Sequence, residues 1–231
     1  NIDKGFKLLE QHILTNSSIH IIIDTDVDGI TSAALMYLYL KDLEKEYKTD
    51  IKITYHMNKG KRHGIILEDK KLKLKDIDLL IVPDAGTNDV EQINICYKNN
   101  VDVLILDHHS LEDSNATKTD AVLINPHSSP NIHNKNISGV GVVYKFCKYI
   151  DEQLGVNYTD TYLDLVALGN IADIIDLREL ETRYLVLQGL SNVQNSFIRE
   201  IIEKQEYVMN GNTNITTIGW NVAPMLNATI R

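Results

Sequence analysis

Three aspartates at alternate positions are the residues of this sequence most suited to chemistry. Asp24, Asp26 and Asp28 follow the apolar run 19–23, and Gly29 comes directly after them. Three like charges within about 7 Å of extended chain repel one another strongly. The spacing therefore indicates that something positive lies among these carboxylates.

Further acidic and imidazole side chains follow two other apolar runs. Asp84 ends one of them, and Asp107, His108 and His109 end the next. In an open parallel α/β sheet the carboxyl ends of the strands line one crevice, so we expect these groups to converge. Carboxylates with one or two imidazoles favour Mn²⁺ or Mg²⁺ over a thiolate zinc site. Phosphoester hydrolysis uses two such ions about 3.5–4 Å apart, and Asp84 is the candidate bridge between them.

Each part of this pattern also has a structural alternative. A single aspartate at a strand end is usually a helix cap or a turn former, and adjacent histidines are often surface residues. The DxDxDG pattern could be a calcium loop, but an EF-hand needs a glutamate at its twelfth position, and here the following residues are apolar. The three clusters together favour the metal site.

Short apolar runs that alternate with helical patterns predict the fold. They indicate an α/β protein with a parallel five-stranded sheet covered by helices, followed by helices that lead toward a truncated second domain. We expect a catalytic domain over 1–192, and a connecting helix with the start of that second domain over 193–231. The predicted strands are 19–25, 51–56, 77–83, 101–106 and 121–125. The predicted helices are 31–46, 88–99 with Asn88 as cap, 138–153 with Ser138 as cap, 159–175 with Thr159 as cap, 181–192 and 197–206.

Composition narrows the class of protein. Of the 231 residues 43% are hydrophobic, which is ample for a core. No apolar run approaches the roughly 18 residues that span a bilayer. Cys96 and Cys147 lack metal-site spacing and are expected to be reduced core residues, which suits a cytoplasmic protein. The net charge of −9 argues against a broad basic nucleic-acid surface, although two divalent cations would offset four of these charges.

Four motifs together resemble the DHH phosphoesterase superfamily in order and spacing. They are DTDVDG (24–29), PDAG (83–86), LDHH (106–109) and ALGNIADIIDL (167–177). Three further stretches are similar to the RecJ-like single-strand-specific exonucleases within it. They are SGVGVVYKF (138–146), ETRYLVLQGL (181–190) and GWNVAPMLNATIR (219–231).

The resemblance implies a role for each matching residue. Asp24 and Asp26 would hold a first metal ion with Asp84. A second ion would be held by Asp28, His108 and Asp173, again with Asp84. The catalytic residues would be Asp84, His109, which would contact the scissile phosphate, and Asp107, which would orient its neighbours.

Substrate-binding residues are expected in three places. Lys61, Arg62 and His63 form the densest basic loop, which could contact a nucleic-acid backbone or simply be solvated. Ser138, Gly139 and Gly141 could hold a phosphate at a helix N-terminus, or could reflect close helix packing. Arg231 matches the closing arginine of the last motif. Met225 departs from the family, which usually has an arginine there.

The resemblance implies a hydrolase of DNA repair and recombination with two Mn²⁺ or Mg²⁺ ions. It would release nucleotides from an end of single-stranded DNA, in the 5′–3′ direction, and prefer DNA to RNA. A monomer without membrane contact is expected, with a single-strand-binding protein as a further partner. Two alternatives stay open: a phosphoesterase of small molecules or short oligonucleotides, and an inactive RecJ-like replication scaffold.

Overall fold

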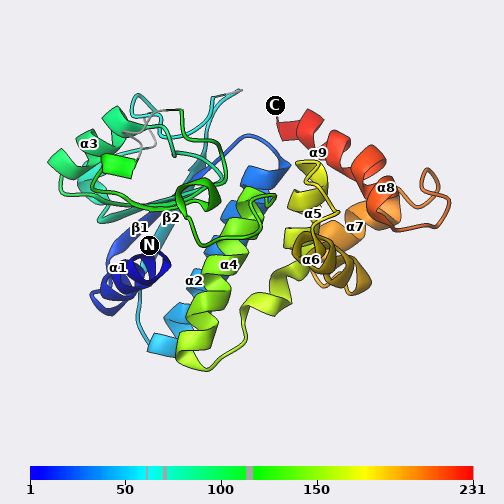
Figure 1. Cartoon of the computed structure of the whole chain (residues 1–231), viewed down its shortest axis with the longest axis horizontal. Coiled ribbons are helices and arrows are strands. Elements are labelled where there is room, and N and C mark those ends of the chain that lie inside the picture. The colour runs from blue at the N-terminus through cyan, green and yellow to red at the C-terminus, as the bar shows by residue number, and fades with distance from the viewer. Residues whose placement is uncertain (61, 70–71, 113–116, 231) are drawn as a thin grey trace.

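A computed structural model describes residues 1–60, 62–69, 72–112 and 117–230 of the protein. Its centre is one sheet of five parallel strands in the order β2-β1-β3-β4-β5 (Figure 1). Each predicted strand overlaps an observed one, with ends that differ by at most two residues, so the predicted five-stranded parallel sheet is confirmed. The strands are β1 (Ser18–Ile23), β2 (Lys52–Met57), β3 (Leu79–Pro83), β4 (Asp102–Leu106) and β5 (Val122–Ile124).

Helices cover both faces of the sheet and continue beyond it. The α-helices are α1 (Ile2–Leu14), α2 (Val27–Tyr47), α3 (Val90–Lys98), α4 (Gly139–Leu154), α5 (Leu163–Ala172), α6 (Leu180–Ser191), α7 (Ser196–Lys204), α8 (Ile215–Thr217) and α9 (Ala223–Ile230). A π-helical turn, η5 (Ile218–Val222), joins α8 to α9. Shorter 3-10 turns are η1 (Leu74–Asp76), η3 (Pro126–Ser128) and η4 (Thr159–Tyr162).

Helix starts were predicted less well than strands. Ser138 is confirmed as the cap of α4, because its hydroxyl accepts the amide of Gly141. Asn88 does not cap α3. Its side chain instead bonds the backbone of Ser110 and Glu112, and α3 begins at Val90. Thr159 starts the 3-10 turn η4 rather than α5. The side chain of Asn88 and the backbone amide of Thr159, which donates to Asp151 Oδ2, found tertiary partners that local sequence does not specify.

The alternation of side chains along each strand divides the core into two clusters. Residues such as Ile21, Ile81 and Leu104 face one cluster with α1, α2, α4 and α5. Ile22, Val82 and their neighbours face the other, with α3. The central strands β3 and β4 are buried on both faces, which is why the sequence shows continuous apolar runs there, whereas the edge strand β2 is largely exposed and partly polar.

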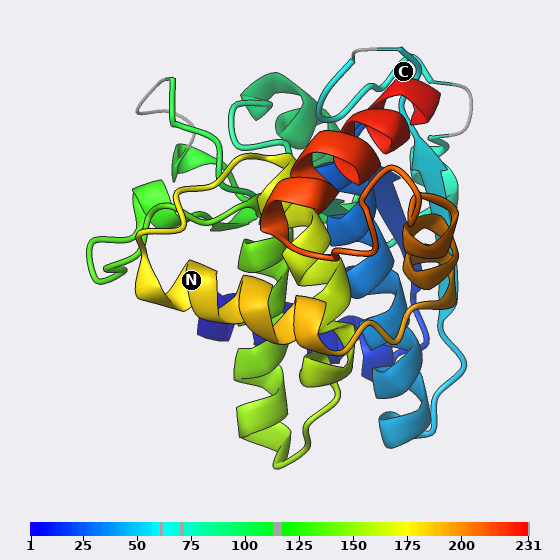
Figure 2. The same cartoon turned by 90° about the vertical axis from the view of Figure 1, so that its right-hand side faces the viewer.

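The segment beyond residue 192 packs against the first core cluster. Ile198, Ile201, Ile218 and Val222 from this segment are buried in the cluster that contains α2, α4 and α5. Figure 2 shows α9 crossing near the start of α2 and the end of α5, and both contacts are present. The boundary at 192 stays a prediction. Among the described residues, no helix combines the length and apolar character that crossing a bilayer requires.

Candidate metal centre

The turn from β1 into α2 carries the three alternate aspartates. Asp24 ends the strand and is buried, Asp26 caps α2 by accepting the amide of Gly29 at 2.9 Å, and Asp28 lies in the first helical turn. The helix therefore begins four residues earlier than predicted, because Asp26 itself is the cap. Gly29 is required here, since a Cβ at this position would lie 2.6 Å from Cβ of Asp24.

Asp84 leaves the end of β3 in a left-handed conformation. Its φ is 62°, and its amide donates to the carbonyl of Leu106 at 2.8 Å. Aspartate tolerates this region better than most residues. The side chain lies against the backbone of α4, because a Cβ on Gly139 would be only 2.2 Å from Asp84 Oδ1. The start of α4 thus forms one wall of the site.

The same helix start holds Asp28. The amides of Gly139 and Val140 donate to its two carboxylate oxygens at 2.6 and 3.0 Å, and Gly141 donates to the hydroxyl of Ser138. All of these residues are buried. The amides that were predicted to hold a substrate phosphate are thus occupied by the protein's own side chains. The structure supports the alternative, close packing of α4, for Ser138, Gly139 and Gly141.

His108 lies where the carboxylates from different elements meet. Its Nε2 is 3.3 Å from Asp84 Oδ1, 3.7 Å from Asp173 Oδ2 and 3.9 Å from Asp28 Oδ2. Ligand atoms of Asp28, His108 and Asp173 all lie within 4.8 Å of one another, and so do those of Asp24, Asp26 and Asp84. The structure therefore brings together every residue that was predicted to bind metal.

Burial makes this cluster costly without a positive partner. Burial and the charge of Asp28 raise the pKa of Asp84 well above its usual value. Burial, with the charge of Asp26, raises the pKa of Asp173 to about 6. Burial lowers the pKa of His108 to about 4, so its imidazole is neutral and can act as a ligand. Oδ1 of Asp24 and Oδ1 of Asp84 are buried and accept no hydrogen bond. Such orphaned carboxylate oxygens fit divalent cations.

Asp107 and His109 form a hydrogen-bonded pair at the cluster, where ligand atoms of Asp84, His108 and His109 also lie within 4.8 Å of one another. Asp107 Oδ1 accepts hydrogen bonds from His109 Nδ1 and from the amides of His108 and His109, and Oδ2 accepts the amide of Thr87. Burial disfavours the charged form of Asp107, but these hydrogen bonds favour that form more strongly and lower the pKa of Asp107 to about 2. The hydrogen bond that His109 donates to Asp107 raises the pKa of His109 to about 9. His109 is thus a half-exposed, charged imidazole that Asp107 holds in place.

The comparison with protein families decides the membership of this chain. The model of the DHH family, N-terminal domain, matches residues 18–170. The chain belongs to the DHH family.

Relatives of this DHH chain include proteins described as exonucleases. It is 36% identical over 231 residues to the putative SPbeta prophage-derived single-strand DNA-specific exonuclease YorK of Bacillus subtilis, covering 100% of this chain and 38% of that protein. It is 30% identical to the single-stranded-DNA-specific exonuclease RecJ of Haemophilus influenzae, covering 98% of this chain and 41% of that protein. A crystal structure of exonuclease RecJ bound to manganese has the same fold, with a TM-score of 0.84 at 24% identity; the match covers 99% of this chain and 57% of that one. The chain thus spans about two fifths of the length of these curated relatives.

The basic loop of the DHH chain reaches the cluster through His63. His63 Nδ1 lies 2.6 Å from Asp24 Oδ2, and both His63 and His109 line a polar hollow of about 480 Å³. Arg62 is exposed and 3.4 Å from Glu68. Lys61 and Arg231, which were also predicted to bind substrate, lie outside the described residues.

Sequence reasoning missed the residues that support the Asp107–His109 pair. Asn125 follows β5, is fully buried, and donates from its amide to Thr87 Oγ1 and to the carbonyl of His109. The available signal was a polar residue directly after the fifth apolar run, at the same sheet edge as the other site residues. Asn227 was missed as well: its Oδ1 accepts the amide of Val27, 200 positions earlier.

Proposed function

We propose that this chain carries the catalytic centre of a RecJ-like exonuclease, which hydrolyses single-stranded DNA from an end with two Mn²⁺ or Mg²⁺ ions. The observation that carries the proposal is the meeting of two ligand groups. The carboxylates of Asp24, Asp26 and Asp84 form one, and Asp28, His108 and Asp173 form the other. Asp84 Oδ1 and His108 Nε2 are 3.3 Å apart, so Asp84 can serve both groups.

The donor set fits hard divalent cations. It supplies carboxylate oxygens and one neutral imidazole, and two buried carboxylate oxygens have no hydrogen-bond donor. When bound, the two ions would activate a water molecule and stabilise negative charge on the phosphoryl oxygens. Asp24 and Asp26 would hold one ion with Asp84, and Asp28, His108 and Asp173 would hold the other with Asp84.

The remaining site residues would contact the phosphodiester or hold the residues that do. His109, held charged by Asp107, would donate a hydrogen bond to a phosphoryl oxygen and balance the negative charge that develops there. Asp107 is saturated by hydrogen bonds from its own chain, so it positions His109 and the loop. Arg62, which is exposed and directly precedes His63 in the sequence, would contact the nucleic-acid backbone.

The substrate follows from the relatives rather than from the site alone. The named relatives are described as specific for single-stranded DNA, and we extend this substrate, with 5′–3′ cleavage, to the present protein. DNA repair and recombination in the cytoplasm, action as a monomer and contact with a single-strand-binding protein belong to the same proposal.

A chain-length series of labelled substrates tests the proposed function. Oligothymidylates of 2 to about 20 nucleotides, labelled at either end, are incubated with the protein and Mn²⁺, with Asp84→Asn as the inactive control. We expect stepwise release of mononucleotides from the 5′ end of the long strands. Hydrolysis of only the shortest substrates would favour the small-substrate alternative. Metal and DNA binding without any hydrolysis would favour the scaffold.

A further inference from the structure

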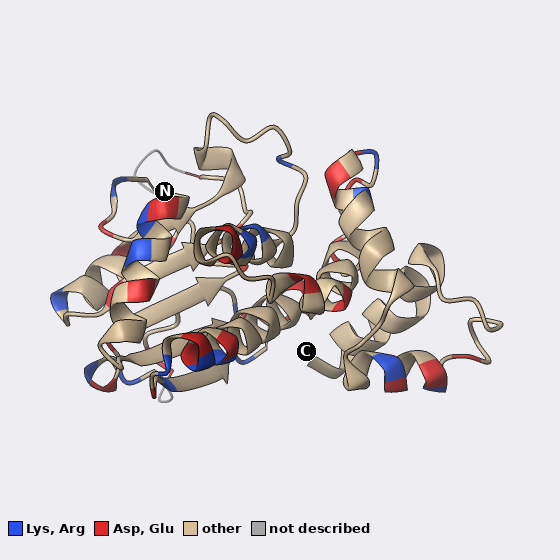
Figure 3. Ribbon diagram, turned by 90° about the horizontal axis from the view of Figure 1, so that it is seen from below, with Lys and Arg blue, Asp and Glu red and all other residues tan. Residues whose placement is uncertain are grey.

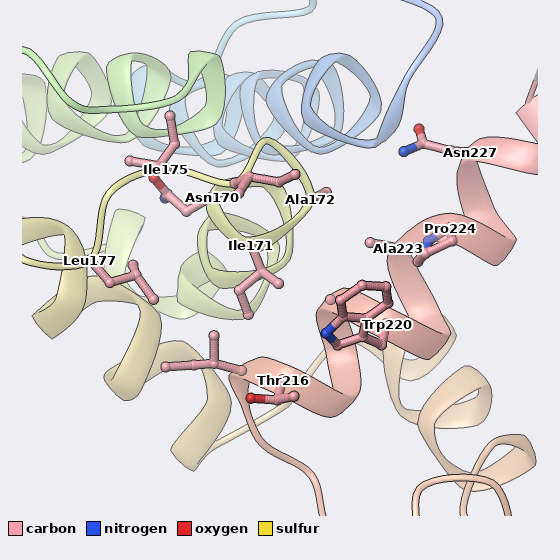
Figure 4. A pocket seen from close by; sticks show the side chains of 13 residues that line it. Asn170, Ile171, Ala172, Ile175, Leu177, Thr216, Trp220, Ala223, Pro224 and Asn227 are labelled. Atoms are coloured by element: carbon pink, nitrogen blue, oxygen red, sulfur yellow. The ribbon is translucent and has the colours of Figure 1, made fainter.

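An apolar groove adjoins the carboxylate cluster. It has a volume of about 690 Å³ and lies between the end of α5 with its following loop and the helical segment 215–227. Figure 4 shows Ile171 and Trp220 projecting from opposite walls into the space between them. Volumes of 300–1,000 Å³ are typical of ligand pockets. The groove is therefore large enough for one or two flat rings.

Two connections join the groove to the metal ligands. Ile174, which lines the groove, is the residue directly after Asp173. On the opposite wall, Asn227 accepts the amide of Val27 at 3.1 Å, and Val27 lies between Asp26 and Asp28. Each wall of the groove is thus tied to a metal ligand through a direct neighbour in the sequence, so a strand whose phosphate lies at the cluster can reach the groove with an adjacent nucleotide.

The walls of the groove suit an uncharged, flat ligand. Trp220 is 79% exposed and Ile174 is 89% exposed, which is unusual for side chains of this size. No described residue that lines the groove is charged, and the whole segment 215–230 is free of Lys, Arg, Asp and Glu (Figure 3). The described lining of the groove thus offers no positive charge to a phosphate but offers an aromatic face to a base.

We propose that this groove is a base-stacking subsite, in which Trp220 stacks on the nucleobase adjacent to the scissile phosphate and Ile174 packs against the same base. The inference rests on the proposed function, because it places the phosphate at the carboxylate cluster. Asn227 adds one polar contact, since its oxygen is engaged by Val27 and its amide nitrogen can donate to a base or sugar oxygen. Stacking accepts every base, so the subsite holds the strand without reading its sequence.

Trp220 is the single tryptophan of the sequence, so its fluorescence reports occupancy of the groove directly. The protein is titrated, with Ca²⁺ in place of Mn²⁺, with a six-residue oligothymidylate and with a strand of the same length built from abasic residues. Trp220→Phe supplies the background signal. We expect quenching by oligothymidylate and little or none by the abasic strand. Equal quenching by the two strands, or no quenching by either, would overturn the subsite.

Kinetics with Mn²⁺ supply the second readout. Loss of one stacked base weakens binding by about 5- to 150-fold, so Trp220→Ala should raise KM by such a factor and Trp220→Phe should restore most of it. Tyr184→Ala removes an aromatic ring of similar exposure on α6, outside the groove, and should match the wild type. If the KM of Trp220→Ala also equals that of the wild type, the base-stacking subsite is wrong, while the proposed exonuclease function is unaffected. If the wild type hydrolyses nothing but distinguishes the two strands by quenching, the subsite stands and the exonuclease fails.

Discussion

The carboxyl edge of the sheet and the groove beside it depart from ordinary packing in opposite ways. At the edge, the carboxylates of Asp24, Asp28 and Asp84 are buried among one another. In the groove, Ile174 and Trp220 extend into water. Folding alone favours neither arrangement, because buried like charges and exposed large apolar side chains both cost stability. Among the described residues the two regions therefore suit different partners: the carboxylates suit divalent cations, and the groove suits a flat apolar group such as the base proposed above.

Other buried polar groups show that burial by itself is not the anomaly. Asp164 is buried, but its carboxylate accepts three backbone amides, from Leu165, Gln194 and Asn195. The carboxylate of Asp84 is as buried, yet its Oδ1 accepts no hydrogen bond. What distinguishes Asp84 from Asp164 is thus the hydrogen-bond donor that Asp84 Oδ1 lacks.

Substitution of Asp84 gives the largest expected effect. Asp84→Asn should lower kcat/KM by on the order of 10³-fold, because both ligand groups lose their shared carboxylate. In EDTA the same variant should be more stable than the wild type by about 1–3 kcal/mol, because one of several buried like charges is removed. Urea unfolding in EDTA measures the gain in stability, and urea unfolding with Mn²⁺ measures the loss of stabilisation by the metal.

Asp164→Asn is the matched control for Asp84→Asn. It should lower stability by about 1–3 kcal/mol with or without EDTA, because it disrupts a satisfied set of hydrogen bonds. If both variants lose stability equally in EDTA, Asp84 is a structural residue and the contrast between the two carboxylates is wrong.

Two glycines test whether the helix start of α4 positions the cluster. A Cβ at Gly139 would meet Asp84 Oδ1 at 2.2 Å, and one at Gly189 would meet the carbonyl of Leu163 at 2.0 Å. Gly139→Ala and Gly189→Ala should each lower stability by about 1–3 kcal/mol. Only Gly139→Ala should also weaken Mn²⁺ binding, by about 10- to 100-fold, because it displaces a ligand. Calorimetric titration of the two folded variants with Mn²⁺ compares their affinities. Equal affinities would contradict the positioning role of α4.

The sequence predicted the edge of the sheet far better than the groove. Apolar runs ending in Asp24, Asp84 and Asp107 identify strands and site together, because parallel strands bring their carboxyl ends to one place. Asp173 became visible only through the resemblance, since an aspartate at the end of a helix has no pattern of its own. Trp220 and Asn227 were missed as site residues because their place depends on the packing of α9 against α2 and α5, which no local pattern encodes.

The histidine pair His20 and His56 gives a smaller, pH-dependent effect away from the cluster. Burial, with the charge of His56, lowers the pKa of His20 to about 4, below its usual 6.5. Its ring bonds His56 and Thr54, each at 2.7 Å. A folded-state pKa below the unfolded value means that this contribution to stability is complete above pH 6.5 and is lost as the pH falls toward 4.

The wild type should therefore lose about 1–2 kcal/mol more stability than His20→Gln when the pH falls from 6.5 to 4, after allowance for solvent screening. Denaturant unfolding at several pH values in EDTA measures the slope. His133→Gln, at an exposed position, serves as the control and should keep the slope of the wild type. An unchanged slope in His20→Gln would show that His20 is protonated without cost in the folded protein.

Ile174 gives the smallest effect and separates stability from function in the groove. It lies two residues after α5 with φ at 55°, and the amide of Ile175 bonds back to the carbonyl of Asn170; Gly or Asn is usual at this position after a helix. A β-branched residue in this conformation is strained. Ile174→Asn should therefore raise stability by about 0.5–1 kcal/mol, or about 2 °C in Tm.

The same change should weaken oligothymidylate binding, because it removes an apolar wall. A variant that gains stability and keeps full affinity would show that the base does not contact Ile174. A variant that loses stability would show that Ile174 is held by packing rather than kept for a ligand.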